Sequence, residues 1–212
     1  DIPQLNTISG DRLRHEIELI FKEKAPQKVL ARAGELGVLR QLSPNLRGDN
    51  LAQVQGASLT LSFCFLLYPL SRQEGESLIA RLNFPKTTGH ILSQTLALKE
   101  ELLKLADLLP TLPHSQLYFL LRDYSPTAIL ANILTTPPPL ISQSLELYMC
   151  HLRYVKLSLS GDDLINLGIP QGPLVGTALE RLMVARLDGM VNSREEESEL
   201  VSQWLTGKAL EY

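Results

Sequence analysis

The stretch that decides the fold runs from residue 161 to residue 176 and reads Gly-Asp-Asp-Leu-Ile-Asn-Leu-Gly-Ile-Pro-Gln-Gly-Pro-Leu-Val-Gly. Gly168 and Gly172 permit backbone angles that other residues avoid. Pro173 favours the first turn of a helix, because its ring presets the backbone angle needed there. The pattern therefore predicts a helix, a tight glycine-rich hairpin and a second helix.

The start of that second helix has two interpretations. The backbone N–H groups of Leu174, Val175 and Gly176 would face outward at the positive end of the helix, where a phosphate binds readily. Alternatively, the segment is only a tight helix–helix turn, and another helix or backbone approaches Gly176 because it has no side chain. The residues alone leave both interpretations open.

Helical patterns continue outward from this stretch in the Leu-rich segments, while alternating strand patterns are scarce. Four sets of helix-start signals stand out: Ser9 with Asp11, Ser71 with Glu74, Ser160 with Asp163, and Ser193 with Glu196. We expect helices near 9–21, 26–36, 51–68, 71–83, 87–105, 115–122, 125–134, 140–155, 161–167, 174–188 and 194–206. Prolines at 137–139 form a break that no helix can cross. The prediction is an all-α protein, an irregular multi-helix array.

The charge balance limits the partners. The 212 residues hold 20 Lys and Arg against 23 Asp and Glu, a net charge of −3. This argues against a tight electrostatic grip on nucleic acid by the whole surface, although local basic stretches remain possible. The densest one comprises Arg12, Arg14, Lys22, Lys24, Lys28 and Arg32. Because Glu16, Glu18 and Glu23 interrupt it, it is either an RNA-binding face or a solvated helix face with ion pairs.

No residues form a pattern typical of catalysis or metal binding. The sequence has no phosphate-cradling glycine loop and no Cys/His ligand spacing. Asp162 and Asp163 diverge by about 100° on a helix, so a helix-capping role is favoured over a shared magnesium ion. Cys64 and Cys150 both lie in apolar runs, and we expect two buried thiols in a reducing cytosol.

Localisation signals are equally sparse. The N-terminus is polar, and the apolar run 59–70 is too short to span a bilayer, so we expect a cytoplasmic protein without membrane contact. The first residue is Asp1 rather than Met, which leads us to expect an excised fragment.

Residues 161–176 resemble the tail motif of class II tRNA nucleotidyltransferases and bacterial poly(A) polymerases. There a Gly-Asp/Lys-Asp-Leu opening precedes a Leu-Gly-x-x-Pro-Gly-Pro-x-Ile/Val-Gly turn, and Gln171 is an ordinary variation. Residues 8–16, Ile-Ser-Gly-Asp-Arg-Leu-Arg-His-Glu, are similar to the neck segment, usually Ser-x-Glu-Arg-Ile-x-x-Glu, with Asp11 where Glu is usual. The resemblance covers both ends well, and the middle only as helical and Leu-rich. It implies a neck-like segment 1–46, a helical body 47–155 and a tail 156–212 with a helix-hairpin-helix-like turn.

The resemblance implies a role in tRNA 3′-end processing. Such enzymes add CCA or A with CTP and ATP, using two Mg²⁺ held by aspartates in an N-terminal catalytic head. The residues of that head are absent here, so we expect no catalytic residue, metal ligand or cofactor in this chain. The partners implied are tRNA or other structured RNA, and the catalytic domain in cis.

Candidate RNA-binding residues come from the neck-like segment and the tail. They are Arg12, Arg14, Lys156, Gly172, Leu174, Val175, Gly176 and Arg181, and Arg153 and Arg186 could also contact phosphates. The contacts would recognise the shape of an A-form stem rather than its sequence. The alternative function is a helical protein–protein interaction or dimerisation scaffold, in which case the protein would be an oligomer.

Overall fold

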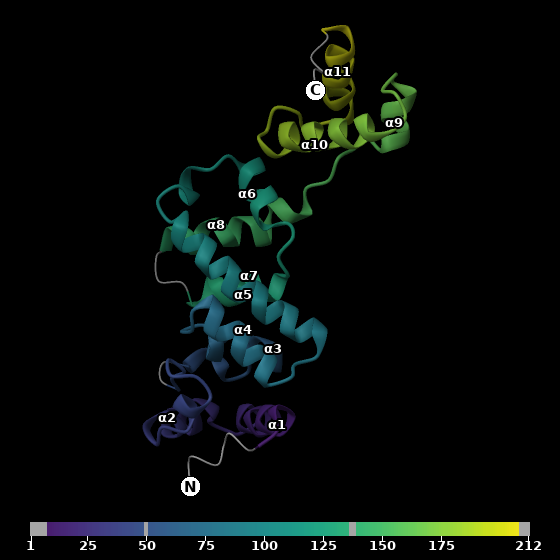
Figure 1. Cartoon of the computed structure of the whole chain (residues 1–212). Coiled ribbons are helices and arrows are strands. Elements are labelled where there is room, and N and C mark those ends of the chain that lie inside the picture. Colours follow the sequence, from purple (N-terminus) through teal and green to yellow (C-terminus); the bar gives the residue numbers. More distant parts are fainter. Residues whose placement is uncertain (1–7, 49–50, 136–138, 208–212) are drawn as a thin grey trace. The chain divides into compact units, whose positions relative to one another are not determined.

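The structure is a computed structural model that describes residues 8–48, 51–135 and 139–207, and these residues form helices and connecting turns but no strand. The α-helices are α1 (Gly10–Phe21), α2 (Pro26–Glu35), α3 (Leu59–Leu67), α4 (Arg72–Arg81), α5 (Lys86–Lys104), α6 (His114–Leu121), α7 (Pro126–Thr135), α8 (Pro139–Cys150), α9 (Gly161–Asn166), α10 (Pro173–Leu187) and α11 (Arg194–Thr206) (Figure 1). Short 3₁₀ turns are η2 (Leu39–Gln41), η3 (Ala52–Val54), η4 (Leu109–Thr111) and η5 (Leu152–Tyr154). The predicted all-α fold is confirmed.

The chain divides into two compact units. The first comprises Asp1–Pro110 with Asp123–Glu146, and the second comprises Thr111–Arg122 with Leu147–Tyr212. α6 therefore belongs to the second unit, although in the sequence it comes between α5 and α7 of the first. This division into two units differs from the three segments predicted from the sequence, at 1–46, 47–155 and 156–212. The three segments stay a prediction.

The first unit is built around α5, which packs against α3, α4 and α7. Its core is apolar, and the ring of Phe63 meets those of Phe21 and Phe84 edge-on, with centroids 4.9 and 4.7 Å away. The buried Asn132 accepts a hydrogen bond from the Tyr68 hydroxyl at 3.0 Å and donates to two backbone carbonyl groups. Because its polar atoms are satisfied, this side chain can lie in the core at little cost.

The first turn of α1 is fastened to the end of α4, and we call this contact the α1–α4 clamp (Gly10, Asp11 and Arg14 with Arg81–Asn83). The Arg14 guanidinium donates to the carbonyl oxygen of Leu82 at 3.0 Å and to that of Asn83. The Asn83 amide donates to the Asp11 carboxylate at 3.0 Å. Leu82 and Asn83 lie just beyond the end of α4, where carbonyl groups receive no hydrogen bond from a further helical turn, and Arg14 supplies donors to them there.

The second unit has its own core beneath α10, which packs against α6, α9 and α11. Glu197 on α11 is fully buried there, and its carboxylate accepts hydrogen bonds from the backbone N–H groups of Ser158 and Leu159, both at 2.9 Å. It also faces the Arg186 guanidinium at 3.8 Å. This one carboxylate joins α11 to α10 and to the segment before α9.

Two predicted helices are shorter than expected. The helix predicted over 51–68 is only α3, because Gly56 adopts a positive φ of 80° and Ser58 caps a new helix by accepting from the Leu61 N–H at 3.3 Å. The helix predicted over 140–155 ends at Cys150 and is followed by η5. Of the prolines at 137–139 that predict a break, the first two lie outside the described residues, and Pro139 begins α8.

The prediction of two buried thiols is half wrong. Cys64 is buried, and burial raises its pKa to about 11. Cys150 is exposed. The buried positions of α8 are Ile141, Ser144, Leu145 and Tyr148, at helical spacing, and Cys150 lies two residues further on, about 200° around the helix.

Candidate nucleic-acid interface

A groove of about 500 Å³ in the second unit brings cations and aromatic rings together. Its lining comes from α6 and its C-cap, from η5 and the segment after it, and from α10: Tyr118, Phe119, Arg122, Arg153, Val155, Lys156, Leu157, Leu179, Glu180 and Met183. We call it the basic-aromatic groove. It has three cationic side chains and one carboxylate, in a chain whose net charge is −3.

Arg122 lies where the aromatic and charged parts of the groove meet. Its guanidinium carbon is 4.5 Å from the centroid of the Phe119 ring, a cation–π contact. The same guanidinium lies 3.4 Å from the Glu180 carboxylate on α10. Because a guanidinium binds phosphate in a planar, two-pronged geometry, an arginine held on a ring is well placed to receive one.

η5 and the segment after it supply the other two cations, Arg153 and Lys156. The Arg153 guanidinium carbon lies 5.1 Å from the centroid of the Tyr154 ring, which is 63% exposed. Lys156 is exposed at the edge of the groove. Nucleic-acid-binding surfaces combine positive charges with exposed aromatic rings, because phosphates bind the charges and bases stack on the rings.

The glycine elbow has the predicted backbone but not the predicted packing. Gly168 and Gly172 have φ of 112° and 134°, and α10 begins at Pro173. A Cβ at Gly176 would meet nothing within 4 Å among the described residues outside its own helix, so the interpretation in which another helix or backbone approaches Gly176 is wrong.

The amides at the start of α10 are only partly open. The Val175 N–H donates to the Gly172 carbonyl oxygen at 3.1 Å and is therefore engaged. The side chains of Leu174 and Val175 pack on the core of the second unit. A phosphate seat at this helix start stays a prediction.

The remaining predicted RNA contacts lie on different surfaces. Arg12 is exposed on α1 and borders an apolar hollow of about 280 Å³ in the first unit. Arg14 is engaged in the α1–α4 clamp and pairs with Asp11 at 3.1 Å and with Glu18 at 3.4 Å. Arg181 is exposed on α10 but does not line the basic-aromatic groove. The basic stretch on α1 and α2 thus contains ion pairs, and its contact with RNA stays a prediction.

The predicted caps are only partly confirmed. Ser160 and Asp163 form a reciprocal capping box at α9. Ser193 accepts from the Glu196 N–H at 3.2 Å, but the Glu196 carboxylate accepts from the N–H of Asn192 instead of Ser193.

At α1 the predicted cap at Ser9 is wrong, although Asp11 does lie in the first turn as predicted. Ser9 makes no capping hydrogen bond with its side chain. The Asp11 carboxylate accepts from the Asn83 side chain across the α1–α4 clamp. The start of α1 is therefore held by tertiary contacts.

Acid should weaken the second unit through Asp163. Hydrogen bonds from Ser160, and then from Arg194, lower the pKa of Asp163 from 3.8 to about 2. Because the folded-state pKa is the lower one, this stabilisation is present above about pH 4 and is lost as the pH falls toward 2. We expect the urea midpoint of Trp204 fluorescence to fall over this window in the wild type and to fall less in Asp163→Asn. Asp162→Asn, in the same turn, serves as the control, and an equal response of both variants would contradict the assignment.

Sequence reasoning missed most of the basic-aromatic groove. Tyr118 and Phe119 lie on α6 and Arg122 is its C-cap, in a segment that the sequence predicted only as a helix. The available signal was the spacing of Phe119 and Arg122, three residues apart on one helical face. Their meeting with Glu180 and Met183 on α10 is a long-range contact that no local pattern reveals.

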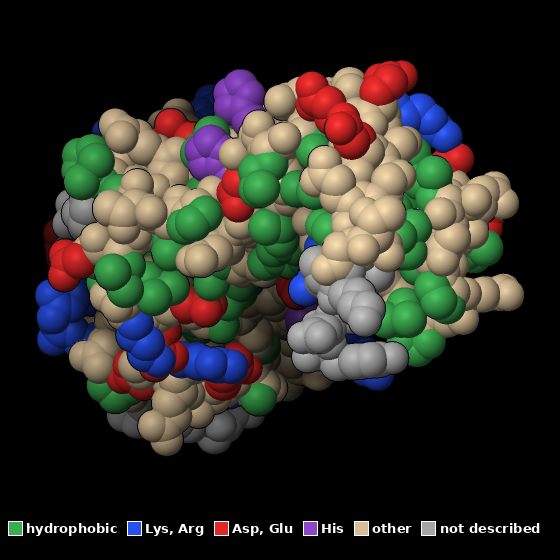
Figure 2. All heavy atoms as spheres, turned by 90° about the horizontal axis from the view of Figure 1, so that it is seen from above, with side chains coloured by type: hydrophobic (Ala, Val, Ile, Leu, Met, Phe, Trp, Pro, Cys, Tyr) green, Lys and Arg blue, Asp and Glu red, His purple; other side chains and the backbone are tan. Residues whose placement is uncertain are grey.

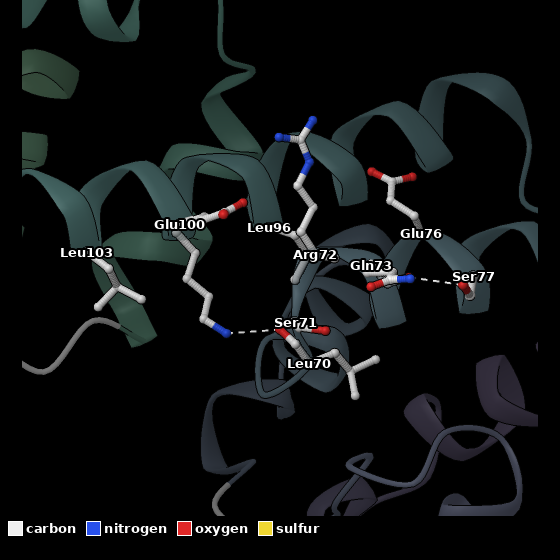
Figure 3. Close-up of a pocket in the computed structure, with 10 residues that line it drawn as sticks. Leu70, Ser71, Arg72, Gln73, Glu76, Ser77, Leu96, Glu100 and Leu103 are labelled. Carbon is white, nitrogen blue, oxygen red and sulfur yellow. Dashed lines mark hydrogen bonds between the residues drawn. The ribbon is translucent and has the colours of Figure 1, made fainter.

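A second hollow, about 750 Å³ in volume, lies between α4 and α5 of the first unit, but its charges are balanced. Figure 3 shows Arg72 and Glu76 on α4 and Glu100 on α5 around it. Lys99 lines it too, but the Lys99 ammonium donates to two backbone carbonyl oxygens beyond α3, at 2.6 and 3.0 Å. With two cations and two carboxylates in its lining, this hollow fits a polyanion less well than the groove does.

On the face drawn in Figure 2, basic and acidic side chains lie in small interspersed groups. Among the described residues no group of three or more His, Cys, Asp or Glu is placed to hold a metal ion. Within residues 8–48, 51–135 and 139–207, none of the helices combines the length and hydrophobicity that a bilayer span requires.

Comparison with known proteins gives consistent results. Residues 2–49 match a family model described as the probable RNA and SrmB-binding site of polymerase A. The A-adding tRNA nucleotidyltransferase of Geobacter sulfurreducens is 26% identical over 91% of this chain. The Thermotoga maritima CCA-adding enzyme complexed with tRNA-CCA has a TM-score of 0.69 at 21% identity over 95% of the chain. A CCA-adding enzyme in apo form II has a TM-score of 0.67 at 20% identity over 93% of the chain.

The chain covers only part of each relative. It spans 24% of the Geobacter protein and 53% and 50% of the two solved chains. By fold, it is an all-α array of the kind found in the C-terminal region of CCA-adding enzymes. The resemblance seen in the sequence is confirmed: the chain is similar to the C-terminal region of tRNA nucleotidyltransferases, both in sequence and in fold.

Proposed function

We propose that this chain is a non-catalytic region that binds tRNA or other structured RNA, and that the basic-aromatic groove is one of its contact surfaces. The observation that carries the proposal is the gathering of Arg122, Arg153 and Lys156 around two aromatic rings in a chain of net negative charge. A solved relative that is complexed with tRNA shares the fold over 95% of this chain, which supports RNA as the partner.

Phosphate contacts of this kind give salt-dependent and largely sequence-independent binding, because cations displace the counterions around the RNA. The aromatic rings add stacking for bases that are not paired. In the proposed parent protein, nucleotide transfer with Mg²⁺, ATP or CTP belongs to a catalytic domain in cis, and the location is the cytoplasm. Labelled tRNA titrated with the whole chain at two salt concentrations tests the proposal, and a lack of binding even at low salt would refute it.

Lys156→Gln should weaken tRNA binding about threefold at 0.1 M salt, or roughly 0.7 kcal/mol, as expected for one exposed ion pair. The slope of log affinity against log salt should fall by about 0.7 to 0.9. Lys104→Gln is the control, because it removes the same charge from an exposed position on α5. Fluorescence anisotropy measures both quantities, and equal losses in the two variants would argue against a specific role for the groove.

A dimerisation scaffold remains the second candidate because large apolar side chains are exposed near the end of α5. Leu103 is 65% exposed and Leu108 is 58% exposed. Light scattering at micromolar concentration separates the two functions. A stable dimer that does not bind tRNA would favour the scaffold.

A further inference from the structure

We propose that Glu180 competes with RNA phosphate for Arg122, so that RNA enters the basic-aromatic groove by exchanging a phosphate for this carboxylate. The inference rests on the proposed RNA-binding function and adds a residue that opposes binding. It makes Glu180 the residue that sets the affinity of the groove.

The Arg122–Glu180 pair is open to solvent. Its two charged groups lie 3.4 Å apart, and the side chains are 40% and 63% exposed. An exposed pair of this kind contributes little to stability, because water and salt screen it and both side chains lose freedom. Separating Glu180 from Arg122 should therefore cost the fold little.

The position of Arg122 does not depend on Glu180 alone. The Arg122 guanidinium also lies over the Phe119 ring, at 4.5 Å from its centroid. When the carboxylate leaves, the ring still holds the guanidinium at the groove. Within the part of the chain that the structure describes, the Glu180 carboxylate contacts Arg122 and has no second contact comparable to the Phe119 ring, so it can move away while Arg122 stays in place.

Charge determines which anion prevails. Glu180 is the one carboxylate among the residues that line the groove, facing Arg122, Arg153 and Lys156. An RNA phosphate meets several of these cations through a continuous backbone, whereas the carboxylate meets one. Glu180 therefore lowers the affinity without closing the site, both by occupying Arg122 and by repelling phosphate.

The test is a double-mutant cycle on the whole chain with fluorescein-labelled tRNA at 0.1 M salt. Glu180→Gln keeps the side-chain shape and removes the charge, and we expect it to tighten binding about twofold to fivefold, the range of an exposed pair. Arg122→Gln should weaken binding. In the Arg122→Gln background, Glu180→Gln should give no more than a small gain, because the competition is already gone.

Three patterns of changed binding would overturn the proposal. An equal gain from Glu180→Gln in both backgrounds would show general repulsion instead of competition for Arg122. Weaker binding by Glu180→Gln would show that the carboxylate contacts RNA, for instance a base amino group. A gain of the same size from Glu199→Gln, an exposed glutamate on α11, would show a non-specific charge effect.

The experiment tests the competition of Glu180 for Arg122 separately from the proposed RNA-binding function. If the wild-type chain binds no tRNA, both hypotheses are refuted. If it binds tRNA and Glu180→Gln does not tighten binding, only the competition hypothesis is refuted. Matching thermal unfolding of the four proteins in the cycle excludes misfolding as the cause of any difference.

Discussion

Replacing Glu197 with alanine should lower the free energy of unfolding of the second unit by about 3 kcal/mol. The Glu197 carboxylate is fully buried and accepts from the N–H groups of Ser158 and Leu159. Its removal leaves those two donors without their partner and the Arg186 guanidinium without its counter-charge, although one nitrogen of that guanidinium is already buried without a hydrogen bond. The loss of stability is large because the buried donors that remain pay their desolvation penalty, in addition to the lost hydrogen bonds.

Urea unfolding followed by tryptophan fluorescence measures this loss directly. Trp204 is the one tryptophan of the chain, and it packs on the core of the second unit from the same helix. Glu199→Ala, an exposed change two residues along α11, is the matched control and should change the midpoint little. A Glu197→Ala midpoint equal to that of the control would mean that the buried carboxylate does not hold the unit together.

Glu197 also shows where local sequence patterns stop being informative. The run Ser193–Glu197 predicts a helix start with acidic residues in the first turn, and α11 does begin there. The pattern selected Glu196 as the reciprocal cap, whereas the residue that turns inward is its neighbour. Which of three consecutive glutamates becomes buried depends on Arg186 and on residues 158–159, and their positions are set by the tertiary fold.

The same limit applies to the candidate interface. The elbow at Gly168–Pro173 follows from local backbone chemistry, and the structure has it. The basic-aromatic groove joins α6 to residues more than thirty positions later, so only folding brings its members together. Arg14 shows the opposite error. The sequence suggested an RNA contact because Arg14 lies in a basic stretch, but the structure places its guanidinium in the α1–α4 clamp.

Gly10→Ala should destabilise the first unit by about 2 to 3 kcal/mol, although alanine is the better helix former. A Cβ at position 10 would lie 1.8 Å from the carbonyl oxygen of Arg81 and 2.9 Å from its carbonyl carbon. That neighbour is backbone, so either α1 or the end of α4 has to move. Such a movement would also strain the bonds of Arg14 and Asp11 in the α1–α4 clamp. The neck-segment pattern accepts any residue at this position, so the sequence does not show that glycine is required there.

Gly176→Ala supplies the matched control for this substitution, because it makes the same change inside another helix where a Cβ meets nothing within 4 Å. It should stabilise the protein by about 0.5 to 1 kcal/mol through helix propensity alone. Thermal unfolding by circular dichroism should therefore show opposite shifts for the two variants. If Gly10→Ala raises the midpoint as Gly176→Ala does, α1 does not approach α4 closely at this point. In that case Asp11 and Arg14 would be available for other partners, and the result would favour the predicted RNA contact at Arg14.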